Sequence, residues 1–364
     1  MQVRVVILFL ILGVSSIQAQ IGGKSTYQFL AMPVSARATA QGGIYNHLYE
    51  NDASLALGNP AMLQASMHKY MGLSYAPYFA GSHAASFSYV HAFKLANFQF
   101  GSQFMNYGKM IEYDELGNDQ GLFNVTDMAL IVGAGRAYKE KYKFGANAKL
   151  AYSQIETYSS LGMAFDLSAM YVDSAKYFSA SLVIRNVGFQ MKAYTKGKGS
   201  QELMPTDIQF GISKRFKFLP FRINVTAHNF TRWDVRYDDP NANTQTSSNI
   251  FDQEEAEPKK AAVFFDNFMR HLIIGGEFQF GKAFNLGFAY NHHCRAELGL
   301  AGRSGLSGFS AGFGIKIKRI QIQYGVAKFA AKGSSNQISF NINLGEQVKT
   351  KKAKTSNNGE NTSN

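Results

Sequence analysis

The stretch that decides the fold is Gln337 to Glu346, which reads QISFNINLGE. Apolar side chains alternate there without a break with polar ones, at Ile338, Phe340, Ile342 and Leu344 on one side and Ser339, Asn341 and Asn343 on the other. This period of two is typical of a β-strand. In a soluble sandwich the apolar side would face the core, whereas in a membrane barrel it faces lipid and the amides face the interior.

The same alternation recurs along the chain, at 98–104, 208–212, 284–290, 309–317 and 320–326. Clusters of glycine, asparagine, aspartate, serine and charged residues interrupt it and delimit 14 predicted strands. These strands are predicted at 68–78, 83–93, 96–110, 122–137, 141–157, 160–172, 176–194, 203–216, 219–233, 269–280, 284–299, 306–317, 319–331 and 336–344.

The links between the predicted strands differ in length according to their position. Those after even-numbered strands are very short, such as Lys94-Leu95 and Lys318-Arg319, whereas several after odd-numbered strands are longer, above all Asp234–Phe268. Outer-membrane barrels have short periplasmic turns and longer surface loops, and a sandwich has no reason to sort its links in this way. The sequence therefore predicts an all-β fold, a 14-stranded antiparallel transmembrane β-barrel over 68–344 with both termini periplasmic.

Composition and the first residues agree with export to the outer membrane. Charged residues are 17% of the 364, below the roughly 25% typical of soluble domains. Arg4, the apolar run Val5–Val14 and the small residue Ala19 predict a cleaved signal peptide over 1–19. Cys294 is the single cysteine, which excludes an internal disulfide, so a closed hydrogen-bonded barrel is the expected source of stability.

Residues 20–67 do not alternate and carry alanine-rich pieces interrupted by glycine and proline. We predict that they form a compact helical hatch, or plug, folded into the periplasmic mouth of the barrel, and the alternative is a periplasmic arm. The tail at 345–364 is polar and basic and is expected to be disordered in the periplasm.

The hatch carries a resemblance to a known family. DASLALGNPAML (Asp52–Leu63) resembles the plug signature of the FadL family of outer-membrane barrels, and Asn59, Pro60 and Ala61 match its Asn-Pro-Ala element. Together with GGKSTYQFLAMPVSARATAQGG (Gly22–Gly43), it resembles the PorQ-like barrels of the type IX secretion system of Bacteroidetes, which are themselves FadL-like.

The resemblance implies a non-enzymatic barrel with no catalytic residue, cofactor or metal. It would anchor a PorZ-like surface protein in the attachment complex, with a PorU-like peptidase and a PorV-like barrel, and fix exported cargo to lipopolysaccharide at the cell surface. The alternative within the FadL family is a transporter for hydrophobic small molecules, which requires an apolar pocket inside the barrel and a gap in its wall. A general porin conflicts with a hatch.

The predicted surface loop Asp234–Phe268 is the candidate partner-binding segment, because its charge opposes the net charge of +12 of the chain. Its candidate residues are Asp238, Asp239, Asp252, Glu254, Glu255 and Glu257. A solvated loop with no partner is the alternative.

Two other kinds of site are not expected. His292, His293 and Cys294 are consecutive, and because neighbours in a strand point to opposite faces, they do not predict a metal site. Nucleic-acid binding is not expected of an exported barrel despite its positive charge.

Overall fold

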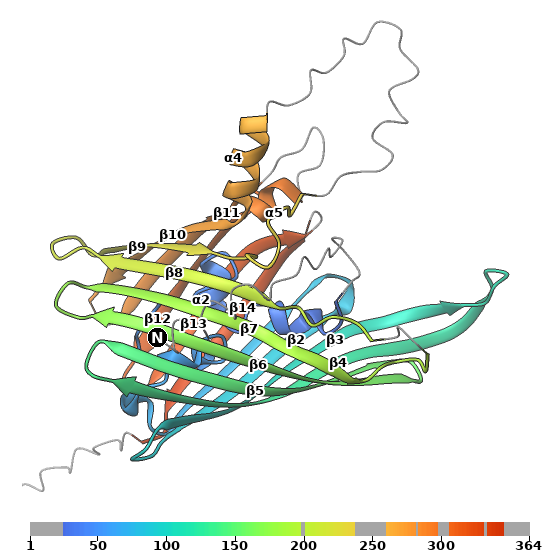
Figure 1. Cartoon of the computed structure of the whole chain (residues 1–364), viewed down its shortest axis with the longest axis horizontal. Helices are drawn as coiled ribbons and strands as arrows, with labels where there is room; N and C mark the ends of the chain where they lie inside the picture. Colours follow the sequence, from blue (N-terminus) through green and yellow to red (C-terminus); the bar gives the residue numbers. More distant parts are fainter. Residues whose placement is uncertain are drawn as a thin grey trace, which may run out of the picture.

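The computed structural model describes residues 25–197, 201–236, 260–281, 283–297, 306–330 and 333–345. In this part of the chain, 14 antiparallel strands form one closed barrel, in which each strand pairs with its sequence neighbours and β1 pairs with β14 (Figure 1). The predicted fold class is therefore confirmed.

The strands are β1 (Tyr70–Pro77), β2 (His83–Ala92), β3 (Asn97–Tyr113), β4 (Asp119–Tyr138), β5 (Tyr142–Ile155), β6 (Tyr158–Asp173), β7 (Phe178–Lys192), β8 (Asp207–Arg215), β9 (Phe221–Ala227), β10 (Leu272–Phe280), β11 (Phe284–Asn291), β12 (Phe309–Ile317), β13 (Ile320–Ala330) and β14 (Gly333–Asn343). The helices are η1 (Gln28–Ala31), α2 (Ala36–Ala40), α3 (Ala53–Ala56), η2 (Pro60–Met62), η3 (Ala65–Met67), η4 (Phe79–Gly81), α4 (Lys260–Arg270) and α5 (His292–Glu297). No helix in the described ranges is long and apolar enough to cross a membrane.

The closing strand shows how the alternation is used. Ile338 and Phe340 of β14 point outward and are 36% exposed, whereas Ser339 and Asn341 point inward and are almost fully buried. The outer surface of the other strands is likewise apolar, with exposed Phe100, Leu130, Phe144, Leu150, Phe165, Phe210, Ile223, Ile274, Leu286, Phe313 and Ile315. A belt of exposed apolar side chains around a closed barrel is the surface that contacts lipid.

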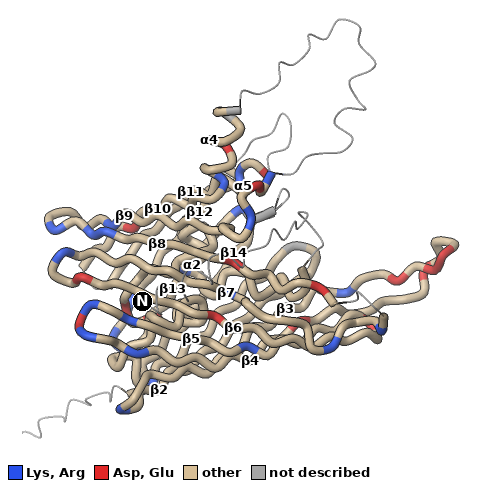
Figure 2. The backbone as a smooth tube through the Cα atoms, in the orientation of Figure 1, with Lys and Arg blue, Asp and Glu red and all other residues tan. Residues whose placement is uncertain are grey.

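The two rims differ in charge. Figure 2 shows Lys and Arg gathered at the short turns on the left and acidic residues at the tip of the β3–β4 hairpin on the right. The predicted loop over 111–121 is shorter than expected, because β3 and β4 extend into it. The Asp114 carboxylate accepts hydrogen bonds from the backbone N–H groups of Leu116 and Asn118, at 2.9 and 2.8 Å, and so closes a tight turn.

Two strands end well before their predicted last residue, each for a local reason. The strand predicted over 284–299 ends at Asn291, whose side-chain oxygen accepts a hydrogen bond from the Cys294 N–H at 3.1 Å and begins α5. The strand predicted over 219–233 ends at Ala227, since Asn229 has a left-handed backbone with φ of 63°.

The predicted loop Asp234–Phe268 and the strand start at 269 were also wrong in part, because α4 covers the end of that segment and β10 begins at Leu272. An ion pair of 2.7 Å between Asp266 and Arg270, one helical turn apart, supports α4. Figure 1 shows α4 projecting from the barrel beside α5.

The N-terminal segment, 25–67, lies inside the barrel (Figure 1), and we call it the hatch. Helix α2 contacts β11 to β14, α3 contacts β1, β2 and β14, and η2 contacts β4 to β6, so the hatch contacts much of the wall. Its short helices begin at capping residues: Ser35 accepts from the Ala38 N–H, and Asp52 accepts from the N–H groups of Ser54 and Leu55. The signal peptide predicted at 1–19 and the tail beyond residue 345 lie outside the described residues.

Candidate functional site

Inward polar side chains of the strands bind the backbone of the hatch. Ser339 and Asn341 of β14 accept hydrogen bonds from the N–H groups of Ala36, at 2.7 Å, and Ala53, at 3.1 Å. Gln99 of β3 donates to the Ala53 carbonyl at 2.8 Å. The amide-lined face in QISFNINLGE thus supplies partners that the short hatch helices cannot supply for their own termini.

The Asn-Pro-Ala element, Asn59 to Ala61, holds the hatch against β4, β5 and β6. The Asn59 side chain accepts from the Ala61 N–H at 2.9 Å and donates to the Asn46 carbonyl. The Ala61 N–H also donates to Ser168 of β6 at 2.9 Å. A Cβ atom placed on Gly145 of β5 would lie 2.3 Å from the Pro60 carbonyl carbon, so glycine is needed for this close approach. The element contacts the wall and so has a structural role in the hatch.

A cluster of four charges joins the hatch to β9 and β10, with Arg37, Arg222 and Glu277 buried and Glu50 partly exposed. Arg37 of α2 binds Glu277 of β10 at 2.7 Å, and Arg222 of β9 binds the other Glu277 oxygen at 2.8 Å. Glu50 of the hatch binds both arginines, at 3.0 Å from Arg37. Two positive and two negative groups leave the cluster neutral, which is what a buried site requires. Sequence reasoning missed this cluster. The available signal was Arg222 and Glu277, two charged residues at inward positions of strands in which apolar and polar residues alternate.

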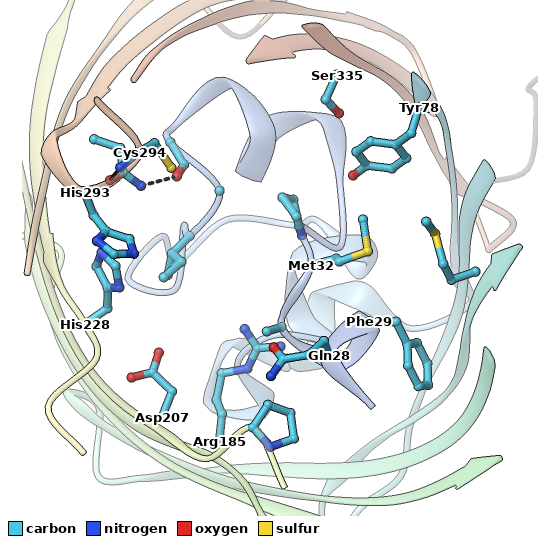
Figure 3. A pocket seen from close by; sticks show the side chains of 18 of the residues that line it. Gln28, Phe29, Met32, Tyr78, Arg185, Asp207, His228, His293, Cys294 and Ser335 are labelled. Atoms are coloured by element: carbon cyan, nitrogen blue, oxygen red, sulfur yellow. Dashed lines mark hydrogen bonds between the residues drawn. The ribbon is translucent and has the colours of Figure 1, made fainter. Parts of the chain in front are cut away.

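Next to the hatch, a cavity of about 660 Å³ opens inside the barrel (Figure 3). Its apolar side is formed by Phe29 and Met32 of the hatch, Tyr78 beside η4, and Met105 and Met110 of β3. This volume lies within the range of about 300–1,000 Å³ that is typical of sites for small molecules.

The opposite side of the cavity is polar and comes from Arg185 of β7, Asp207 of β8, His228 after β9 and His293 of α5, along the left and lower edge of Figure 3. Arg185 donates to the Leu30 carbonyl at 3.0 Å, which ties it to the hatch. Burial, and then the neighbouring His293, lower the pKa of His228 to about 4, so this imidazole is neutral at pH 7. We call these four residues the polar arc.

The wall is irregular where it borders the cavity. The β3–β4 register shifts between Asn106 and Lys109, with Gly108 at φ of 82°, and the β6–β7 register shifts beside Asn186, at φ of 55°. Within the described ranges, β14 pairs with β1 only as far as Ile338, although β14 itself begins at Gly333. Bulges re-aim side chains, and here they bring Tyr107 and Asn186 to the cavity.

The sequence-predicted site residues are distributed as follows. Asn59, Pro60 and Ala61 lie together in the hatch, and the acidic residues Asp238, Asp239, Asp252, Glu254, Glu255 and Glu257 lie outside the described residues. His293 and Cys294 line the cavity, whereas His292 binds Asp266 at 3.1 Å. In the part of the chain that the structure describes, no group of three or more His, Cys, Asp or Glu is placed to hold a metal ion.

Comparison with known proteins supports the fold. No protein-family model and no curated protein sequence matches the chain. Among solved structures, a deletion mutant of the TodX monoaromatic hydrocarbon channel matches with a TM-score of 0.50 and 13% identity, over 86% of this chain and 98% of that one.

Two further solved structures match over similar lengths. The CymD monoaromatic hydrocarbon channel matches with a TM-score of 0.47 and 14% identity, over 86% of this chain and 97% of that one. The Ralstonia pickettii toluene transporter TbuX matches with a TM-score of 0.47 and 11% identity, over 85% and 96%. The TodX match confirms a FadL-like outer-membrane barrel fold. The finer resemblance to the PorQ-like barrels stays a prediction.

Proposed function

We propose that this barrel takes up hydrophobic small molecules through the outer membrane and that the cavity beside the hatch is where they bind. The single observation that carries the proposal is a cavity of about 660 Å³ inside the barrel, with aromatic and methionine side chains along one side. Methionine side chains are flexible and polarisable, so they accommodate apolar ligands of varied shape.

A transporter for hydrophobic small molecules is the alternative function that the sequence suggests. It requires an apolar pocket inside the barrel, and the cavity is such a pocket. The irregular pairing of β3, β7 and β14 near the cavity supports a route through the wall. The matched TodX structure is described as a monoaromatic hydrocarbon channel, and this description supports the same class of cargo here. These three points favour transport over the anchoring role.

Filling the cavity should stop uptake. Ala31 lines the cavity at the end of η1 and is exposed, so a tryptophan there has room to enter the cavity without displacing the hatch. In cells that lack other hydrocarbon channels, Ala31→Trp should lower the initial rate of radiolabelled p-xylene uptake by about 10-fold relative to the wild-type chain, because the binding volume is occupied.

The matched control is Ala31→Ser, which keeps the side chain small and should retain the wild-type rate. Surface expression of all variants is measured in parallel. Equal uptake by wild-type cells and cells without the barrel would exclude this function.

A second candidate function is the docking of a surface protein, and α4 favours it. Phe264 and Phe265 are 58% and 62% exposed on this helix, at the rim opposite the short turns. Exposed aromatic side chains are enriched at protein interfaces. The partner would be the PorZ-like surface protein of a type IX attachment complex, with PorU-like and PorV-like companions. Affinity purification separates the two candidates, because docking requires a stoichiometric companion protein and transport does not.

A further inference from the structure

The polar arc holds buried atoms that lack partners. Arg185 Nε, His228 Nε2 and His293 Nδ1 have no hydrogen-bond partner among the described residues. Arg185 is 6% and His228 5% exposed, so neither side chain is well hydrated by bulk solvent. A buried polar group without a partner is costly and calls for a specific explanation. All three residues line the same cavity, which points to a ligand that completes them.

The arrangement of these atoms suits an oxygen atom of a ligand. The rings of His228 and His293 lie 6.5 Å apart between centroids and meet edge to face. The ring nitrogens lie on the ring edges, so rings at this separation are near enough for one ligand group to contact both. A neutral imidazole has one donor and one acceptor nitrogen, so a hydroxyl group, which both donates and accepts, matches such a pair.

The net charge of the arc selects against a charged head group. The positive charge of Arg185 faces the negative charge of Asp207 along the arc, and both Asp207 oxygens already accept hydrogen bonds, from Gln209 and the Asn229 N–H, each at 2.7 Å. An anionic head group would be attracted by Arg185 but repelled by Asp207. A neutral head group is not repelled by either residue.

We propose that the cavity selects uncharged ligands that combine an apolar body with one hydroxyl group, in preference to pure hydrocarbons. The apolar body would lie against Phe29, Met32 and Met105, and the hydroxyl would bridge His228 and His293. This inference rests on the proposed function and narrows it, because it names a chemical class that fills both sides of the cavity. A pure hydrocarbon would leave the three polar atoms without partners.

The test uses two probes of nearly the same shape, 2-naphthol and 2-methylnaphthalene, which differ in a hydroxyl against a methyl group. Binding to the full-length barrel in lipid nanodiscs is followed by naphthalene fluorescence, with empty nanodiscs correcting for partition into lipid. The wild-type barrel should bind 2-naphthol about 10-fold more tightly than 2-methylnaphthalene, the effect expected when buried polar groups gain partners.

In the double variant His228→Phe/His293→Phe this preference should fall to about 2-fold or less, because the bridging nitrogens are gone. His83→Phe, which makes the same change at an exposed histidine outside the cavity lining, should keep the preference. His293→Phe alone provides a second variant, since α5 is not one of the paired strands of the barrel, and it should lose most of the preference.

The outcomes separate the two proposals. If the wild-type barrel binds both probes equally, or if the double variant keeps the preference, the hydroxyl inference is overturned while the hydrophobic-ligand function stands. If neither probe binds, both are overturned.

Discussion

Replacing Glu277 with leucine should loosen the hatch. Glu277 is fully buried and binds both Arg37 and Arg222, so its loss leaves two buried positive charges with Glu50 alone. Breaking a buried ion pair by removing one partner typically costs about 3–5 kcal/mol. Because the cluster joins the hatch to the wall, its loss should destabilise the bound position of the hatch. The hydrogen bonds between the strands of the barrel should not change.

The measurement is trypsin cleavage after Arg37, a residue that is 4% exposed in the seated hatch. Glu277→Leu should accelerate this cleavage at least about 10-fold, which corresponds to a loss of more than 1.4 kcal/mol in seating. Asp234→Asn, which removes an exposed ion pair with Arg236, is the control and should have no effect.

A second variant distinguishes charge from packing. Glu277→Leu combined with Arg222→Met restores neutrality, with Arg37 and Glu50 still paired at 3.0 Å, and should recover part of the protection. Rapid cleavage in the double variant, equal to that of Glu277→Leu, would show that buried charge is not what holds the hatch.

A valine at Gly145 should displace the hatch while leaving the barrel closed. The new Cβ would lie 2.3 Å from the Pro60 carbonyl carbon and 2.4 Å from the Ala61 nitrogen, and both are backbone atoms that cannot move alone. Valine suits a strand, so β5 itself should keep its pairing with β4 and β6.

Planar-bilayer conductance tests this expectation. Gly145→Val should produce stable open channels at least about 10-fold more conductive than the wild-type barrel, since a barrel of 14 strands without a hatch leaves an aqueous lumen. Gly197→Val is the matched control, because no atom of the described ranges lies within 4 Å of a Cβ there. Wild-type conductance in Gly145→Val would contradict the seating of the Asn-Pro-Ala element on β5.

Much of the barrel is predictable from the alternation of apolar and polar residues, and the structure shows where this alternation no longer predicts the fold. Alternation places Ser339 and Asn341 inside and Phe340 outside, because a strand has a strict period of two. The helix at 292–297 escapes that rule, since the side chain of Asn291 caps it, and capping competes with pairing only once the strand has reached the rim.

The cavity is not predictable in the same way. His228, His293 and Arg185 are far apart in sequence and meet only through barrel closure and the bulge beside Asn186. A bulge shifts the register by one residue, so it breaks the alternation that a sequence reading relies on. The Glu277 cluster likewise depends on which part of the hatch reaches β10, which no local pattern encodes.

The central claim is that the cavity inside the barrel binds hydrophobic molecules, and Cys294 tests it most directly. Its thiol is the only one in the chain, and it lines the cavity. Burial, and then the nearby Glu297 carboxylate, raise its pKa to about 11, so at pH 8 it is a slowly reacting thiol.

The measurement is the rate of maleimide labelling of Cys294 in the wild-type barrel, in lipid nanodiscs, with and without saturating 2-methylnaphthalene. A ligand in the cavity should slow labelling at least about 5-fold, because it covers a thiol whose reactivity depends on access. An unchanged rate in the presence of the ligand would contradict the account.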